Sequence, residues 1–183
     1  MKQFVIILIT LTLLGCVDQR AKNSALLVGA SSASINPDVG AFIAGGRQDR
    51  PVTGIHDSIF VKSIVVSDAD NHFAILTFDC IGMLYPTLVE IRQAIALRIP
   101  VSQFDPNHIV MASSHTHSGP DVVGIWGANQ ISSGVDSVYM KAVVRKSVDV
   151  IVAAWANRKE VSVTLQNQPL ATNGFIIFQN PKN

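Results

Sequence analysis

Hydrophobic residues along the chain gather into short runs typical of strands and into two stripes at helical spacing. The runs are dense in β-branched and other apolar residues, and such runs predict strands. They lie at residues 25–35, 57–68, 72–79, 107–114 and 161–167. Only Ala69-Asp70-Asn71 separates the second run from the third, so these two predict a hairpin. Residues 36–51 are rich in Gly, Pro and Asp and predict a long loop.

The two stripes predict two amphipathic helices. The first stripe has spacings of four, three and four positions and consists of Leu84, Leu88, Ile91 and Ile95. Pro86 suits the first turn of a helix, and Ile99-Pro100 ends it, which predicts a helix over 86–98. The second stripe, interpreted as core packing, consists of Met140, Val144, Val148, Ile151 and Trp155. The order β-β-β-α-β-α-β then predicts an α/β fold, a mixed sheet with helices packed on it.

Composition narrows the class of protein. The 183 residues suffice for one domain, and 48% of them are hydrophobic whereas 15% are charged, which excludes a disordered chain. The 14 basic residues nearly balance the 13 acidic ones, so no electrostatic field favours nucleic acid or an anionic membrane. We therefore expect no nucleic-acid partner.

The first residues resemble a bacterial lipoprotein signal. Lys2 precedes an apolar run at 4–14 that is too short to span a bilayer and ends in Leu13-Leu14-Gly15-Cys16. We expect residues 1–15 to be the signal peptide, Cys16 to be acylated and 16–24 to form a polar tether. The alternative is an ordinary secretory signal in which the cysteine is incidental. The first interpretation predicts an exported protein that is lipid-anchored to the cell envelope, at the outer membrane in a Gram-negative cell because Val17 follows the cysteine.

A pair of histidines follows the predicted strand at 107–114. Side chains two positions apart in an extended segment point to the same side, with Cα atoms about 6.6 Å apart, so His115 and His117 can converge on one metal. Catalytic zinc usually takes three protein ligands, and the pair supplies two. The alternative is two histidines hydrogen-bonded in a polar loop. Neighbouring hydroxyls that can orient imidazoles, and the turn at Gly119-Pro120, favour the metal site.

The surrounding sequence resembles the N-terminal part of the catalytic domain of the neutral/alkaline ceramidase family. The stretches that carry the resemblance are VGASSASINP, TGIHDSIFVKSIVVSD and NHIVMASSHTHSGPD. Amidohydrolases and some phosphoesterases also carry a strand-borne His-x-His, but on the opening strand of a barrel. Too few residues follow the pair here for such a barrel.

The resemblance implies a zinc-dependent amide hydrolase that cleaves the N-acyl bond of ceramide or a related N-acyl amide. It implies that His115 binds Zn²⁺ and that His117 is catalytic, holding the water or the amide oxygen beside the metal. The family's other ligands, a histidine, a glutamate and a tyrosine, lie beyond the segment that matches. We therefore expect 25–183 to be an incomplete portion of a larger catalytic domain, inactive alone. A lipid or N-acyl amide substrate, and a membrane reached through the lipid anchor, are the implied partners.

Two departures from the family pattern put ceramide itself in doubt. Residues 121–127 differ from the small and aromatic residues that follow Gly-Pro in ceramide-cleaving members, and Asn173-Gly174-Phe175 replaces a segment that supplies an active-site arginine. A second hypothesis is therefore a non-catalytic exported lipoprotein domain that binds a ligand or a partner.

Other candidate residues have weaker signals. Asp79 either orients a metal ligand or caps a turn, and the sequence does not say whether His56 reaches the site. His72 is expected to be exposed in the hairpin turn, and His108 to be structural. Cys80, the one cysteine besides Cys16, is expected to be a buried small hydrophobe.

Overall fold

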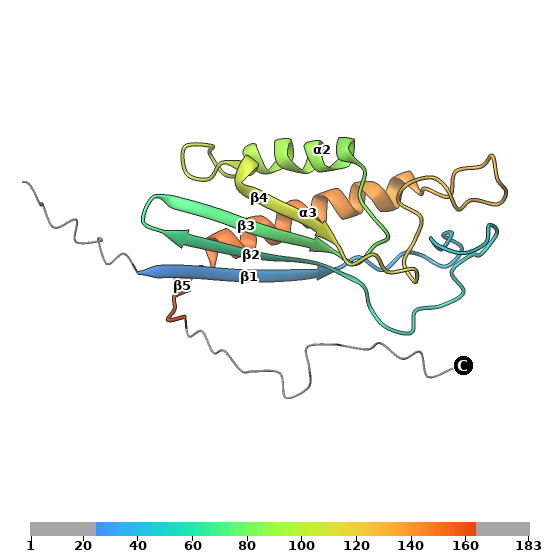
Figure 1. Ribbon diagram of the computed structural model, residues 1–183, viewed down its shortest axis with the longest axis horizontal. Helices are drawn as coiled ribbons and strands as arrows, with labels where there is room; N and C mark the ends of the chain where they lie inside the picture. The colour runs from blue at the N-terminus through green and yellow to red at the C-terminus, as the bar shows by residue number, and fades with distance from the viewer. Residues whose placement is uncertain (1–24, 164–183) are drawn as a thin grey trace, which may run out of the picture.

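The computed structural model of the chain describes residues 25–163, and these form a five-stranded sheet (Figure 1). The strand order is β4-β3-β2-β1-β5. The strands are β1 (Leu26–Ser34), β2 (Phe60–Asp68), β3 (Asn71–Phe78), β4 (Ile109–Ser113) and β5 (Lys159–Glu160). β3 and β4 are parallel, and the other neighbours are antiparallel. The predicted hairpin is therefore confirmed as β2 and β3.

Two helices cover one face of the sheet, which confirms the predicted fold class. α3 (Ser137–Ala156) packs across β1 and β2, and α2 (Tyr85–Ala96) packs beside α3. α2 begins where Pro86 was expected to start a helix, and the 3₁₀ helix η1 (Pro106–His108) leads into β4. The Arg92 side chain of α2 donates to the backbone carbonyls of Pro106 and Ile109, which fixes the helix over the start of β4.

The alternation of buried and exposed side chains explains which face the helices cover. On β3, Leu76 and Phe78 are fully buried under the helices, whereas Ile75, which precedes Leu76, is 40% exposed on the opposite face. On β2, Val65 is buried and Ile64 is 46% exposed. Both strands are thus apolar on both sides, a pattern typical of a sheet that is covered on both faces. Within residues 25–163, no helix lies on the second face.

The C-terminal end of β1 is tied to α3 by two polar contacts. The Tyr139 hydroxyl donates to the carbonyl of Ile35 at 2.8 Å, and the Lys146 ammonium donates to the carbonyl of Ser34 at 2.6 Å. Burial raises the pKa of Tyr139, so its hydroxyl stays a donor. These bonds satisfy two backbone carbonyls at the C-terminal end of β1.

The final predicted strand is wrong in its bounds. β5 covers Lys159–Glu160, whereas 161–163 are irregular and 164–167 lie outside the described residues. The register pairs Glu160 with Leu27, and the N–H of Val161 makes the last bond, to the carbonyl of Leu26, the first residue of β1.

The predicted signal peptide, the tether and Cys16 also lie outside the described residues. Of the helices in 25–163, none is long and apolar enough to cross a membrane.

Cys80 is buried, as expected. It is 1% exposed, and its sulfur lies 3.4 Å from the hydroxyl oxygen of Ser113. Burial raises the pKa of the thiol, so the thiolate needed for nucleophilic chemistry is disfavoured.

Gly29 allows the close approach of β1 to α3, and its substitution tests this packing. A Cβ atom at Gly29 would lie 1.9 Å from the backbone carbonyl oxygen of Ala154. We predict that Gly29→Ala lowers the free energy of unfolding by about 2 kcal/mol or more, because backbone must shift. Denaturant unfolding measures this. Gly54→Ala, with nothing within 4 Å of its added methyl, should change stability by less than about 0.5 kcal/mol. If the two substitutions changed the free energy of unfolding equally, the close packing of Gly29 against α3 would be contradicted.

Candidate metal site at the carboxyl ends of the parallel strands

The β3-α2-β4 crossover brings the carboxyl ends of two parallel strands to one edge of the sheet. The N–H of Ser114, just after β4, donates to the carbonyl of Phe78, the last residue of β3, at 2.9 Å. The loops that follow these strands therefore start side by side, at the right-hand end of the sheet in Figure 1. Ligand sites of α/β sheets commonly lie in such loops.

His115 stands at this edge in a constrained conformation. Its backbone has φ of 59°, a left-handed region that costs a non-glycine residue about 1 kcal/mol or more. Its Nδ1 lies 2.6 Å from the carbonyl oxygen of Ile81, in the loop after β3. Because a carbonyl only accepts, Nδ1 must carry the proton, and the Nε2 of the neutral ring keeps its lone pair. That is how a metal-binding histidine is usually held.

His117 places a second nitrogen beside the first. Its Nε2 lies 3.4 Å from Nε2 of His115, with ring centroids 5.0 Å apart. Two nitrogens at about 2.0–2.1 Å from one tetrahedral zinc are themselves about 3.4 Å apart. The same separation also fits a weak hydrogen bond between the two rings, the alternative that the sequence left open.

The donor set fits zinc in type and spacing but supplies only two nitrogens. Among residues 25–163, no group of three His, Cys, Asp or Glu side chains is arranged to hold a metal ion. The predicted convergence of the histidines is therefore observed. A third ligand is not found within this range.

The loop at 42–50 holds His117 in place. A Cβ atom on Gly45, which has φ of 80°, would lie 2.3 Å from Nδ1 of His117, so only glycine lets this backbone pass the imidazole. Arg50 donates to the carbonyl of His117 at 2.9 Å. Beyond His117, the N–H of Ala44 donates to the carbonyl of Gly119, and the N–H of Asp121 donates to the carbonyl of Phe42. The predicted long loop is thus paired with the segment that carries the histidines.

Asp121 is a structural residue that the sequence did not reveal. It is 1% exposed, and its carboxylate accepts four backbone N–H groups, of Val123, Gly124, Trp126 and Gly134, at 2.8 to 3.2 Å. These bonds compensate for burying the charge and shape the loop that leads from the histidines to α3. An Asp directly before a glycine-rich segment is a recognisable loop signal, but the partner at Gly134 depends on the tertiary fold.

Among residues 25–163, neither Asp79 nor His56 joins the two imidazoles in a three-ligand group. Asp79 accepts the N–H of Phe60 at 2.9 Å, so it caps the start of β2. His56 is 97% exposed, with its Nδ1 2.8 Å from a carboxylate oxygen of Asp57.

The prediction that His72 is solvent-exposed is wrong. β3 begins at Asn71, so His72 already faces the helices, and its ring stands edge-on to Trp155 of α3 at 5.0 Å. Burial, and then the charge of Arg158, lowers its pKa. Its Nδ1 is buried with no hydrogen-bond partner among the described residues.

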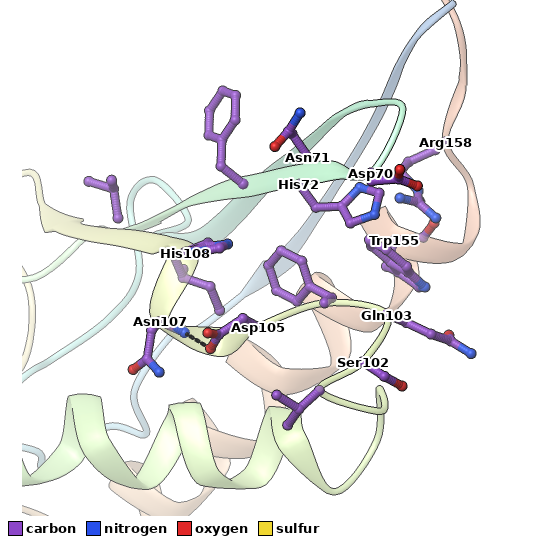
Figure 2. Close-up of a pocket in the computed structure, with 15 residues that line it drawn as sticks. Asp70, Asn71, His72, Ser102, Gln103, Asp105, Asn107, His108, Trp155 and Arg158 are labelled. Carbon is purple, nitrogen blue, oxygen red and sulfur yellow. Dashed lines mark hydrogen bonds between the residues drawn. The ribbon is translucent and has the colours of Figure 1, made fainter. Parts of the chain in front are cut away.

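Figure 2 shows His72 in a pocket of about 780 Å³. His108, which is exposed on η1, also lines this pocket. This pocket lies at the amino ends of β3 and β4, opposite the histidine pair.

Two solved ceramidase structures resemble this fold. One is neutral ceramidase from Pseudomonas aeruginosa, with a TM-score of 0.65, 19% identity and 76% of this chain covered. The other is a ceramidase complexed with C2, with a TM-score of 0.62, 20% identity and 75% covered. This chain spans 23% and 22% of the lengths of those chains. No family profile matches the sequence, and no curated protein does. The likeness establishes a ceramidase-like fold.

Zinc titration tests the histidine pair. With two neutral nitrogens, we predict that the chain lacking residues 1–16 binds zinc with Kd no tighter than about 1 µM, roughly 8 kcal/mol. His115→Ala should abolish this binding. His108→Ala, which removes an exposed histidine at the other end of the sheet, should leave it unchanged. Nanomolar binding that His115→Ala abolishes would instead reveal a third ligand within the chain.

Proposed function

We propose that this protein is a zinc-dependent amide hydrolase of the neutral ceramidase type, to which the chain contributes His115 and His117. The observation that carries the proposal is the convergence of the two Nε2 atoms, 3.4 Å apart, at the carboxyl ends of parallel strands. The ceramidase-like fold supports it, since those solved structures are named as ceramidases.

Each histidine has a distinct role in the proposal. His115 would hold the metal through Nε2, because its Nδ1 is committed to the Ile81 carbonyl. His117 would orient the water or the amide oxygen through its own Nε2, which lies 3.4 Å from Nε2 of His115. Zinc, when bound, would lower the pKa of a water molecule and polarise the acyl carbonyl. The substrate class is an N-acyl amide, with ceramide one member of it.

A second candidate function follows from the small number of ligands. Because residues 25–163 offer no three-ligand group, the protein could instead be a non-catalytic lipoprotein domain that uses the same fold to bind a ligand or a partner. Hydrolysis assays separate this candidate from the first.

We predict that the natural protein carrying this sequence hydrolyses ceramide or an N-acyl amino acid, that chelation removes the activity and that zinc restores it. His115→Ala should lower kcat/KM by more than about 100-fold, because a zinc site loses a ligand. His108→Ala is the matched control and should stay near the wild-type value. Release of fatty acid measures both. Activity that survives chelation, or none on any N-acyl amide, would contradict the proposal.

We also propose that the protein is exported and anchored to the cell envelope by lipid on Cys16. The support is the Leu-Leu-Gly-Cys sequence directly after the apolar run at 4–14. Metabolic labelling with a palmitate analogue should mark the wild type, and Cys16→Ser should lose the label. Cys80→Ser, which removes a buried thiol, should keep it. Equal labelling of Cys16→Ser would exclude the anchor.

A further inference from the structure

A groove of about 460 Å³ runs beside the histidine segment, within the usual size range of small-molecule sites. Thr116 and Ser118, which alternate with the two histidines, line one side of it. Its apolar wall is formed by Ile43, Val52, Ile55 and Ile59. Neither His115 nor His117 lines the groove, so it is a site adjacent to the imidazole pair rather than part of it.

Arg50 supplies the positive charge of this groove. One guanidinium nitrogen donates to the carbonyl of His117 at 2.9 Å, which anchors the side chain. A guanidinium has five N–H donors, so several remain for a ligand. Within residues 25–163, Arg50 makes no ion pair. The groove also contains Asp57, whose carboxylate oxygen lies 2.8 Å from Nδ1 of His56.

We propose that the groove binds an aliphatic carboxylate. The carboxylate would take the free N–H groups of Arg50, since a guanidinium matches the two oxygens of a carboxylate in a planar, bidentate pair. The hydrocarbon chain would lie along the isoleucine and valine wall, which removes apolar surface from water. An anionic head and an apolar tail are the two features that this lining recognises together.

Two compounds of this class fit the neighbouring histidine pair. One is an N-acyl amino acid, whose carboxylate lies a few bonds from the amide, and the other is the fatty acid that amide cleavage releases. This choice of source rests on the proposed hydrolase function. The carboxylate site itself does not, because it depends on Arg50 and the apolar wall alone.

Isothermal titration of the full chain with N-octanoylglycine and with its uncharged primary amide tests the proposal. We predict that the carboxylate binds at least tenfold more tightly than the amide. Arg50→Gln keeps an N–H donor for the His117 carbonyl but removes the charge, and it should abolish this preference. Arg50→Lys should retain part of it. Arg47→Gln makes the same charge change in the same loop, at a residue that does not line the groove, and should keep the full preference.

The apolar wall gives an independent measurement. Adding two methylenes, from octanoyl to decanoyl, should tighten binding about tenfold if both are buried, and Ile55→Ser should reduce this gain. Tighter binding of N-octanoylglycine than of octanoate would identify the substrate as the source, and the reverse order the product. Equal affinity for the carboxylate and the amide, a preference that survives Arg50→Gln, or no binding at all would overturn the proposal.

His115→Ala separates the groove from the hydrolase. This variant removes the proposed zinc ligand and should leave carboxylate binding unchanged, because His115 does not line the groove. Loss of hydrolysis with retained binding would then leave the groove proposal standing. Loss of binding in His115→Ala would overturn the view that the two sites are separate.

Discussion

The hydrogen bond between Nδ1 of His115 and the carbonyl of Ile81 is the contact on which the site depends. It joins the loop after β4 to the loop after β3, two segments 34 residues apart in sequence. It also decides which nitrogen carries the proton, and so directs the lone pair of Nε2 toward His117. The left-handed backbone at His115 is tolerable because this bond and the pairing of the neighbouring strands both hold it.

That contact exists only because β3 and β4 are parallel. A parallel pair needs a crossover, and α2 supplies it, anchored by Arg92 over the start of β4. The sequence was sufficient to predict the elements of this unit, because strand runs and helical stripes are local patterns. It predicted no pairing partner for β4. The predicted bounds of the last strand were wrong for a similar reason. β5 runs antiparallel to β1, so its pairing ends where β1 begins.

The candidate site was predictable only in the part that depends on local sequence. The spacing of His115 and His117 predicted that their side chains meet, and their Nε2 atoms do lie 3.4 Å apart. The extended backbone assumed for this prediction is not observed, because His115 has φ of 59°. The features that hold them are not local: Gly45 and Arg50 reach His117 from about seventy residues earlier in the chain. His72 was placed wrongly because its burial under Trp155 depends on how α3 crosses the sheet. A motif thus identifies candidate ligands, while their tautomer and orientation require the tertiary fold.

The tautomer of His115 is the most direct test of this account. Long-range ¹H–¹⁵N correlation NMR on uniformly labelled chain, assigned with His115→Ala and His117→Ala, distinguishes a protonated Nδ1 from a protonated Nε2. The account predicts that His115 carries its proton on Nδ1 at neutral pH and that adding zinc shifts the Nε2 resonance. A proton on Nε2, with no response to zinc, would contradict the assignment of His115 as a metal ligand.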